Sequence, residues 1–210
     1  MKKLIAIIVE GPSDEVILAT GLNDLLDDEN YRIKVFHGNL LTSDQNLSSQ
    51  KSSKALIGDF VKKQIIEKLH LKKNDISHII QLADIDGVYN TEVTLTAIRE
   101  LHQTRLNELS TTSQILDVPY ALYYMSRNLE DVLIGKADCT DAEKKQISED
   151  FIMNYSEEYE KFKAFFESFT TNKFSDFHSS WQFIKENTAT PTTNIVYFFD
   201  LIEGIYGEPY

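Results

Sequence analysis

Residues 2–18 read KKLIAIIVEGPSDEVIL, and this stretch decides the fold. Its first part, KKLIAIIVE, is a continuous apolar run with β-branched residues, which is typical of a strand buried on both faces. Pro12 then marks a turn, and Ser13 is a candidate N-cap for a helix whose apolar residues recur at helical spacing. The stretch therefore predicts a strand, a short turn and a helix.

The alternation of strand and helix continues over about the first 125 residues. The further predicted elements are strands at 31–38, 77–86 and 120–126, and helices at 54–70 and 91–109. Strands that alternate with helices imply βαβ units and parallel pairing. We therefore predict an α/β fold with a mostly parallel, four-stranded sheet flanked by helices.

After Ser126 the pattern changes, and only helical patterns follow. This change predicts two units, an α/β catalytic domain over residues 1–125 and a helical C-terminal extension over residues 126–210. The extension is rich in aromatic residues, which we interpret as helix-packing core rather than as a stacking platform for bases.

The composition favours a soluble cytoplasmic protein. The only cysteine, Cys139, excludes an intramolecular disulfide and fits a reducing compartment. The apolar start is too short for a signal peptide and ends at Glu10 without a small-residue cleavage site. No apolar run approaches the ~20 residues of a membrane helix, so we expect no membrane partner.

The net charge of −12 argues against a general coat of phosphate-binding residues, but the charge is unevenly spread. Residues 45–75 contain seven lysines, at positions 51, 54, 62, 63, 68, 72 and 73. Lys51 and Lys54 begin a predicted helix and are candidates for gripping a nucleic-acid backbone. The alternative interpretation of the lysine-rich stretch is an ordinary solvated helix surface.

Four carboxylates fall at or near the ends of two predicted strands. Glu10 ends the first strand, Asp14 follows four residues later, and Asp84 and Asp86 end the strand at 77–86. Ligands of open parallel sheets bind at the carboxyl ends of strands, so neighbouring strands would bring these acids together. Such a cluster repels itself unless one or two hard cations, Mg²⁺ or Mn²⁺, lie between the carboxylates. The alternatives are a helix-dipole role for Asp14 and turn formation by Asp86.

IIVEGPSDEVIL at residues 7–18, followed by IIQLADIDGV at residues 79–88, resembles the Toprim domain. The Toprim pattern has an apolar strand ending in Glu-Gly, an acid four residues after the Glu, and Asp-x-Asp at a later strand end. The resemblance covers roughly residues 3–125. It implies that Glu10 acts as an acid/base or metal ligand and that Asp84 and Asp86 hold Mg²⁺. Asp14 would join the same metal site.

The absence of a tyrosine-bearing domain and of a zinc-binding region leaves a small hydrolytic Toprim protein. YYMSRNLEDVL at residues 123–133 looks like the corresponding part of stand-alone OLD-family-type nucleases. That resemblance implies that Arg127 contacts a phosphate and that Glu130 completes a second metal site. Glu130 could equally be an ordinary acid in the first turn of a helix. The implied activity is metal-dependent hydrolysis of phosphodiester bonds in DNA or RNA.

Two other functions remain open at this point. LADIDGVYN also resembles the first motif of haloacid dehalogenase-type phosphatases, which would make Asp84 a nucleophile, Asp86 a general acid and Ser126 a phosphate anchor. The second alternative function is that of a non-catalytic Toprim module in a larger complex.

Resemblance to OLD-family proteins also implies a possible ABC-type ATPase partner on another chain, because no Walker sequence occurs here. It further implies a role in phage defence or DNA repair.

Overall fold

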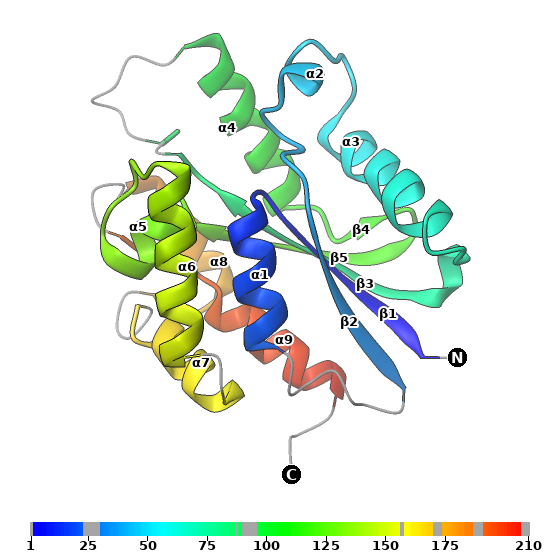
Figure 1. Cartoon of the computed structure of the whole chain (residues 1–210). Helices are drawn as coiled ribbons and strands as arrows, with labels where there is room; N and C mark the ends of the chain where they lie inside the picture. Colours follow the sequence, from blue (N-terminus) through cyan, green and yellow to red (C-terminus); the bar gives the residue numbers. More distant parts are fainter. Residues whose placement is uncertain are drawn as a thin grey trace.

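The structure is a computed structural model that describes residues 2–22, 30–86, 88–89, 96–155, 158–169, 174–186 and 191–206. Figure 1 shows a twisted central sheet with helices on both of its sides. The described strands are β1 (Lys3–Val9), β2 (Tyr31–His37), β3 (Ile76–Asp84), β4 (Gln114–Ile115) and β5 (Val118–Met125). The observed fold is therefore α/β, as the sequence predicts.

The described sheet has five strands in the order β2-β1-β3-β5-β4. The four longer strands pair in parallel, and only β4 is antiparallel, beside β5. The prediction of four strands was therefore wrong by one. β4 is too short to show a periodicity, and it is joined to β5 by Leu116 and Asp117, both with left-handed backbone angles typical of a tight hairpin.

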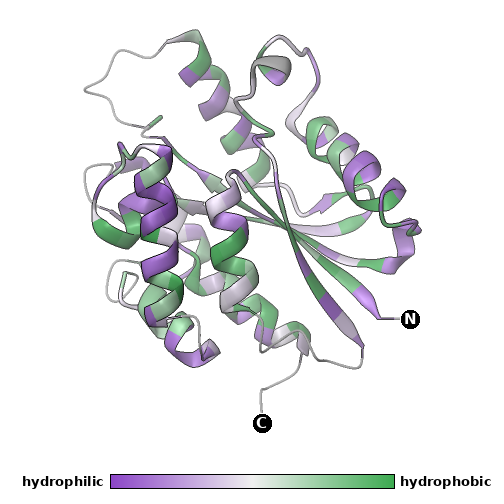
Figure 2. Ribbon diagram, in the orientation of Figure 1, coloured by the Kyte–Doolittle hydropathy of each residue, from purple (hydrophilic) through white to green (hydrophobic). Residues whose placement is uncertain are grey.

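One face of the sheet is covered by α3 (Ser53–Phe60), η2 (Val61–Glu67), α4 (Ala97–Ser110) and α8 (Phe177–Glu186). The opposite face is covered by α1 (Pro12–Gly21), α5 (Leu129–Ile134), α6 (Asp141–Tyr155), α7 (Tyr159–Glu167) and α9 (Val196–Tyr206). The short helices α2 (Asp44–Leu47) and η3 (Lys73–Asp75) lie in connections. Successive residues of β1 alternate between the two cores, which explains its unbroken apolar sequence and the green central strands in Figure 2.

The C-terminal helices share a core with the sheet. Phe162, Phe166, Phe198 and Phe199 are fully buried on the α1 face. The prediction of an aromatic core, made for Phe165, Phe166, Trp181, Phe198 and Phe199, is confirmed for the last four, which are buried, whereas Phe165 is only partly buried. Both parts of the chain contribute to this core, while the division at residue 125 into two domains stays a prediction.

Buried hydrogen bonds join the segment 191–206 to β5. Asn194 accepts a hydrogen bond from the backbone N–H of Tyr124 at 2.8 Å and donates to Ser180 Oγ at 3.0 Å. Thr193 donates to the Tyr124 carbonyl at 2.6 Å. None of the helices that the structure describes is long and apolar enough to cross a bilayer.

Candidate functional site

The carboxyl ends of β1 and β3 lie side by side, as the carboxylate hypothesis requires. β1 pairs with β3 in parallel, so Glu10, directly after β1, lies beside Asp84, the last residue of β3. Glu10 Oε1 accepts a hydrogen bond from the backbone N–H of Asp84 at 3.3 Å. The strand pairing therefore brings these two predicted residues together.

The turn after β1 directs Asp14 back over the same edge. Gly11, not Ser13, is the N-cap of α1, and Pro12 occupies the first turn, where its missing N–H costs nothing. The backbone N–H of Gly11 donates to Asp14 Oδ2 at 2.9 Å. This contact holds the Asp14 carboxylate at the start of the helix, within reach of the strand ends.

Asp86 lies in a turn that joins the ends of β3 and β5. Its backbone N–H donates to the Arg127 carbonyl at 3.1 Å, and that of Ile85 donates to the Met125 carbonyl at 3.0 Å. Asp86 has a left-handed φ of 50°, a conformation that aspartate tolerates better than most residues. Asp86 therefore forms a turn and also places its carboxylate near the other acids.

Glu130 enters the cluster from α5. The Asn128 side chain caps this helix by accepting the Asp131 N–H at 3.0 Å, which fixes the first turn. Glu130 is buried, with 3% of its surface exposed, which an ordinary dipole-stabilising acid would not be. Burial raises the pKa of Asp131, and the charge of the exposed Arg127 opposes this shift, so that charge lies near the Asp131 carboxylate. The role of Arg127 towards a phosphate stays a prediction.

The acidic residues perturb one another strongly. Burial, then Asp86 and Asp14, raise the pKa of Glu10 from its ordinary 4.5 to about 8. Burial also raises the pKa of Asp14 to about 6, with a further contribution from Glu130. The pKa of Asp84 lies well above its usual range because of burial and four neighbouring carboxylates. The pKa of Asp86 is also raised, mainly by partial desolvation of its carboxyl although the residue surface is exposed, and the charges of Lys144 and Arg99 oppose this shift.

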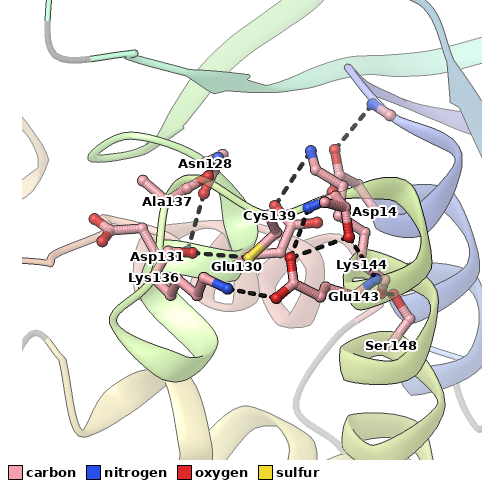
Figure 3. A network of polar contacts seen from close by, with 12 residues as sticks. Asp14, Asn128, Glu130, Asp131, Lys136, Ala137, Cys139, Glu143, Lys144 and Ser148 are labelled. Atoms are coloured by element: carbon pink, nitrogen blue, oxygen red, sulfur yellow. Dashed lines mark hydrogen bonds and ion pairs between the residues drawn. The ribbon is translucent and has the colours of Figure 1, made fainter.

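Lys144 of α6 is a member of this site that the sequence analysis missed. Its Nζ lies 3.5 Å from Glu130 Oε2, and Asp84 and Asp14 both help to raise its pKa. Figure 3 shows Asp14, Glu130 and Lys144 where α1, α5 and α6 meet. Only the fold brings Lys144 here, because no sequence pattern links it to the strand ends.

A capping box fixes the turn that carries Lys144. The Thr140 N–H donates to Glu143 Oε2 at 2.8 Å, and the Glu143 N–H donates to Thr140 Oγ1 at 3.3 Å. Lys136 also binds Glu143 at 2.5 Å. Lys144 is thus presented from a well-defined helix start.

Arg99 is a second cation that the sequence analysis missed. Its Nη2 donates to the Asp86 carbonyl at 3.4 Å, and its charge lowers the pKa of the Asp86 carboxyl. Arg99 lies in the first turn of α4, where the helix dipole disfavours a cation, but the helix predicted over 91–109 did not reveal this position. Two basic side chains from opposite faces of the sheet thus approach the acids.

The donor set fits a hard divalent cation, since every ligand candidate is a carboxylate oxygen. Among the described residues, no three acidic, histidine or cysteine side chains are arranged to grip one metal ion as they stand. Glu10 and Asp14 each accept a backbone N–H through one carboxylate oxygen, which leaves the second oxygen of each group free to bind a metal ion. A cavity of about 10 Å³ borders Asp14 and Asp84, close to the space of one water molecule.

The two lysines predicted to bind nucleic acid lie at the start of α3. Lys51 lines a surface groove and pairs with Asp59 at 2.5 Å. Lys54 is exposed and does not line that groove. Their contact with nucleic acid stays a prediction.

Comparisons with known proteins add no relative: no family model, curated protein or solved structure matches this chain.

Proposed function

We propose that this chain is a metal-dependent phosphodiesterase of the Toprim type that hydrolyses DNA or RNA. One observation carries the proposal: acidic side chains from four separate elements gather at the carboxyl edge of β1 and β3. They are Glu10, Asp14, Asp84, Asp86 and Glu130. Assembling like charges in a half-buried place is destabilising for the fold, which points to a functional reason for keeping them.

The residues have distinct chemical parts in this proposal. Asp14, Asp84, Asp86 and Glu130 would hold one or two Mg²⁺ or Mn²⁺ ions. Such ions, when bound, activate a water and stabilise the leaving oxygen of a phosphodiester. Glu10, with a pKa of about 8 before metal is bound, could exchange a proton near neutral pH.

The cations at the edge of the cluster suit an anionic substrate. Lys144 and Arg99 both lower the pKa of Asp86, which puts positive charge from two directions near that carboxylate. Each can contribute a charge-assisted hydrogen bond to a phosphate oxygen. We assign them to binding of the scissile phosphate, with Arg127 as a third candidate.

The phosphatase alternative receives less support from the geometry. Ser126 would be its phosphate anchor, yet it is buried, accepts the Thr192 N–H at 2.9 Å and donates to Asp131 at 3.5 Å. Glu10 and Asp14 would also have no part in that reaction. The family resemblance extends the nuclease proposal to phage defence or DNA repair, with an ATPase on a partner chain.

The test is cleavage of plasmid, single-stranded DNA and tRNA with Mg²⁺ or Mn²⁺ present. We expect cutting that EDTA abolishes and that Glu10→Gln and Asp84→Asn each reduce at least 100-fold, as loss of acid–base or metal-ion catalysis implies. Glu67→Gln is the matched control, because Glu67 is an exposed glutamate of η2 on the other face of the sheet.

A phosphomonoester runs in parallel. Turnover of that substrate needing Asp84 but not Glu10 would replace the nuclease proposal with the phosphatase. Metal binding without cleavage of any substrate would favour a non-catalytic module.

A further inference from the structure

A groove runs along the outer edge of the sheet, between β2 and the helices α3 and η2. Its larger part has a volume of about 570 Å³, and Phe36, Phe60, Lys34 and Lys68 are among its lining residues. A smaller part of about 240 Å³ adjoins it, shares Phe60 and Gln64 with it, and adds Lys51 and Lys63. We call the two adjoining parts together the β2 groove.

The β2 groove is basic on an acidic protein. It contains two acids, and both are paired: Glu15 binds His37, and Asp59 binds Lys51. Among the residues that the structure describes, Lys34, Lys63 and Lys68 form no ion pair with an acid. The groove therefore carries surplus positive charge although the chain has a net charge of −12.

Aromatic rings lie among these lysines. Phe36 of β2 and Phe60 at the end of α3 are only half-buried, and Lys34 Nζ lies 5.5 Å from the Phe36 ring centroid. A Cβ at Gly38 would lie 2.9 Å from Phe60 Cε2, so the glycine makes room for the ring. The wall beside Phe60 continues as the π-helix η2, a rare element that occurs often at functional sites.

One end of the groove lies near the carboxylate cluster. His37 and Glu15 line this end, and Glu15 directly follows Asp14 in α1. His37 also lies close enough to Asp14 for its charge to act on that carboxylate. A strand lying in the groove would thus continue towards the acids.

We propose that the β2 groove binds single-stranded nucleic acid and guides it to the carboxylate cluster. Positive charge that follows a backbone, interleaved with rings on which bases can stack, is the recognition chemistry of single strands. Paired bases of a duplex cannot stack on Phe36 and Phe60, so the groove selects unpaired segments. The guiding of a strand to the acids rests on the proposed nuclease function. Binding of the strand in the groove does not require catalysis.

The test measures fluorescence anisotropy of a labelled single-stranded 15-mer in EDTA, with full-length protein. We expect Lys34→Gln/Lys68→Gln to weaken binding about tenfold at 0.1 M salt. The double variant should also flatten the slope of log affinity against log salt by roughly 1.4, since each lost phosphate contact contributes about 0.7. Phe36→Leu should weaken binding about tenfold through lost stacking.

The control is Lys145→Gln/Lys161→Gln, which removes the same charge from exposed lysines of α6 and α7 on the opposite face. Equal loss of affinity in both double variants would overturn the proposal, because net charge alone would then explain binding. Duplex DNA or a polyglutamate peptide binding as tightly as the single strand would also overturn it.

Cleavage assays separate this proposal from the nuclease proposal. Groove variants that lose both binding and cleavage of single strands support the delivery role. Binding that depends on the groove, in a protein that cuts nothing with metal, supports the groove while refuting the nuclease. Cleavage of single strands that the groove variants leave unchanged refutes the groove and leaves the nuclease standing.

Discussion

Glu10→Gln should stabilise the metal-free protein, and more so at higher pH. The pKa of Glu10 is raised from 4.5 to about 8 by burial and by the neighbouring Asp86 and Asp14. Below the pKa that this carboxyl has in the unfolded chain, it is protonated in both states and costs the fold no stability. As the pH rises from about 4.5 to about 8, the fold progressively loses stability relative to the unfolded chain, in which the carboxyl ionises freely. Glutamine lacks this penalty.

The magnitude follows from the two pKa values. At pH 7 the pH is about 2.5 units above the unfolded pKa of Glu10, so keeping this carboxyl protonated in the fold costs at most about 3.5 kcal/mol at roughly 1.4 kcal/mol per unit. At pH 5 the same reasoning gives less than about 1 kcal/mol. Solvent reaches part of the Glu10 side chain, so we expect a gain of roughly 1–2 kcal/mol at pH 7, or about 3–6 °C in Tm.

The assay is thermal and urea unfolding of both proteins at pH 5, 6, 7 and 8 in EDTA, with Glu67→Gln as the control. The stability difference should grow with pH and then level off near pH 8. Mg²⁺ should stabilise both proteins by mass action, because the proposed ligands Asp14, Asp84 and Asp86 are present in each. A difference that is the same at pH 5 and pH 8 would refute the strained-carboxylate reasoning, and so would a variant that is less stable at pH 7.

Three further perturbations probe other parts of the molecule. Lys144→Gln should lower Tm in EDTA by a few degrees at pH 8 and less at pH 5, because the lysine offsets carboxylate repulsion only when the acids are ionised; equal loss at both pH values would contradict this. Gly21→Ala should destabilise the fold by about 1–3 kcal/mol in urea titrations, since its Cβ would overlap the Phe162 ring, whereas Gly204→Ala has open space and should not. Asn194→Ala should cost about 2–3 kcal/mol in the same titrations by leaving the Tyr124 N–H unpaired, and a neutral result would show that water replaces the side chain.

The sheet was predictable because its strands carry strong local signals. A run such as that of β1, buried on both faces, has no competing interpretation once a turn and a helix follow it. β4 was missed because its two residues carry no period, although the hairpin beside it uses Asp117 in a left-handed conformation that aspartate tolerates. The helix predicted over 54–70 was right in place, but its second half is a π-helix, which periodicity does not distinguish.

The residues of the candidate site also divide into those that local sequence signals predict and those that only the fold brings together. Glu10, Asp14, Asp84 and Asp86 were predictable because strand ends are visible in sequence and parallel neighbours meet at one edge. Lys144 was not, because it reaches the acids from a helix that packs against α1 far along the chain. Long-range placement of this kind depends on helix packing, which local patterns do not encode.

The carboxylates of the cluster repel one another, and hydrogen bonds from backbone N–H groups keep two of them in place. The Asp84 N–H donates to Glu10, and the Gly11 N–H donates to Asp14, so one acid is anchored by the end of β3 and the other by the start of α1. These contacts lower the pKa of each acid, yet burial wins for both. Lys144 adds positive charge from α6, with its Nζ 3.5 Å from Glu130 Oε2. The acids are therefore kept together by backbone contacts from two elements and by neighbouring cations, and this balance supports the proposal of a metal site.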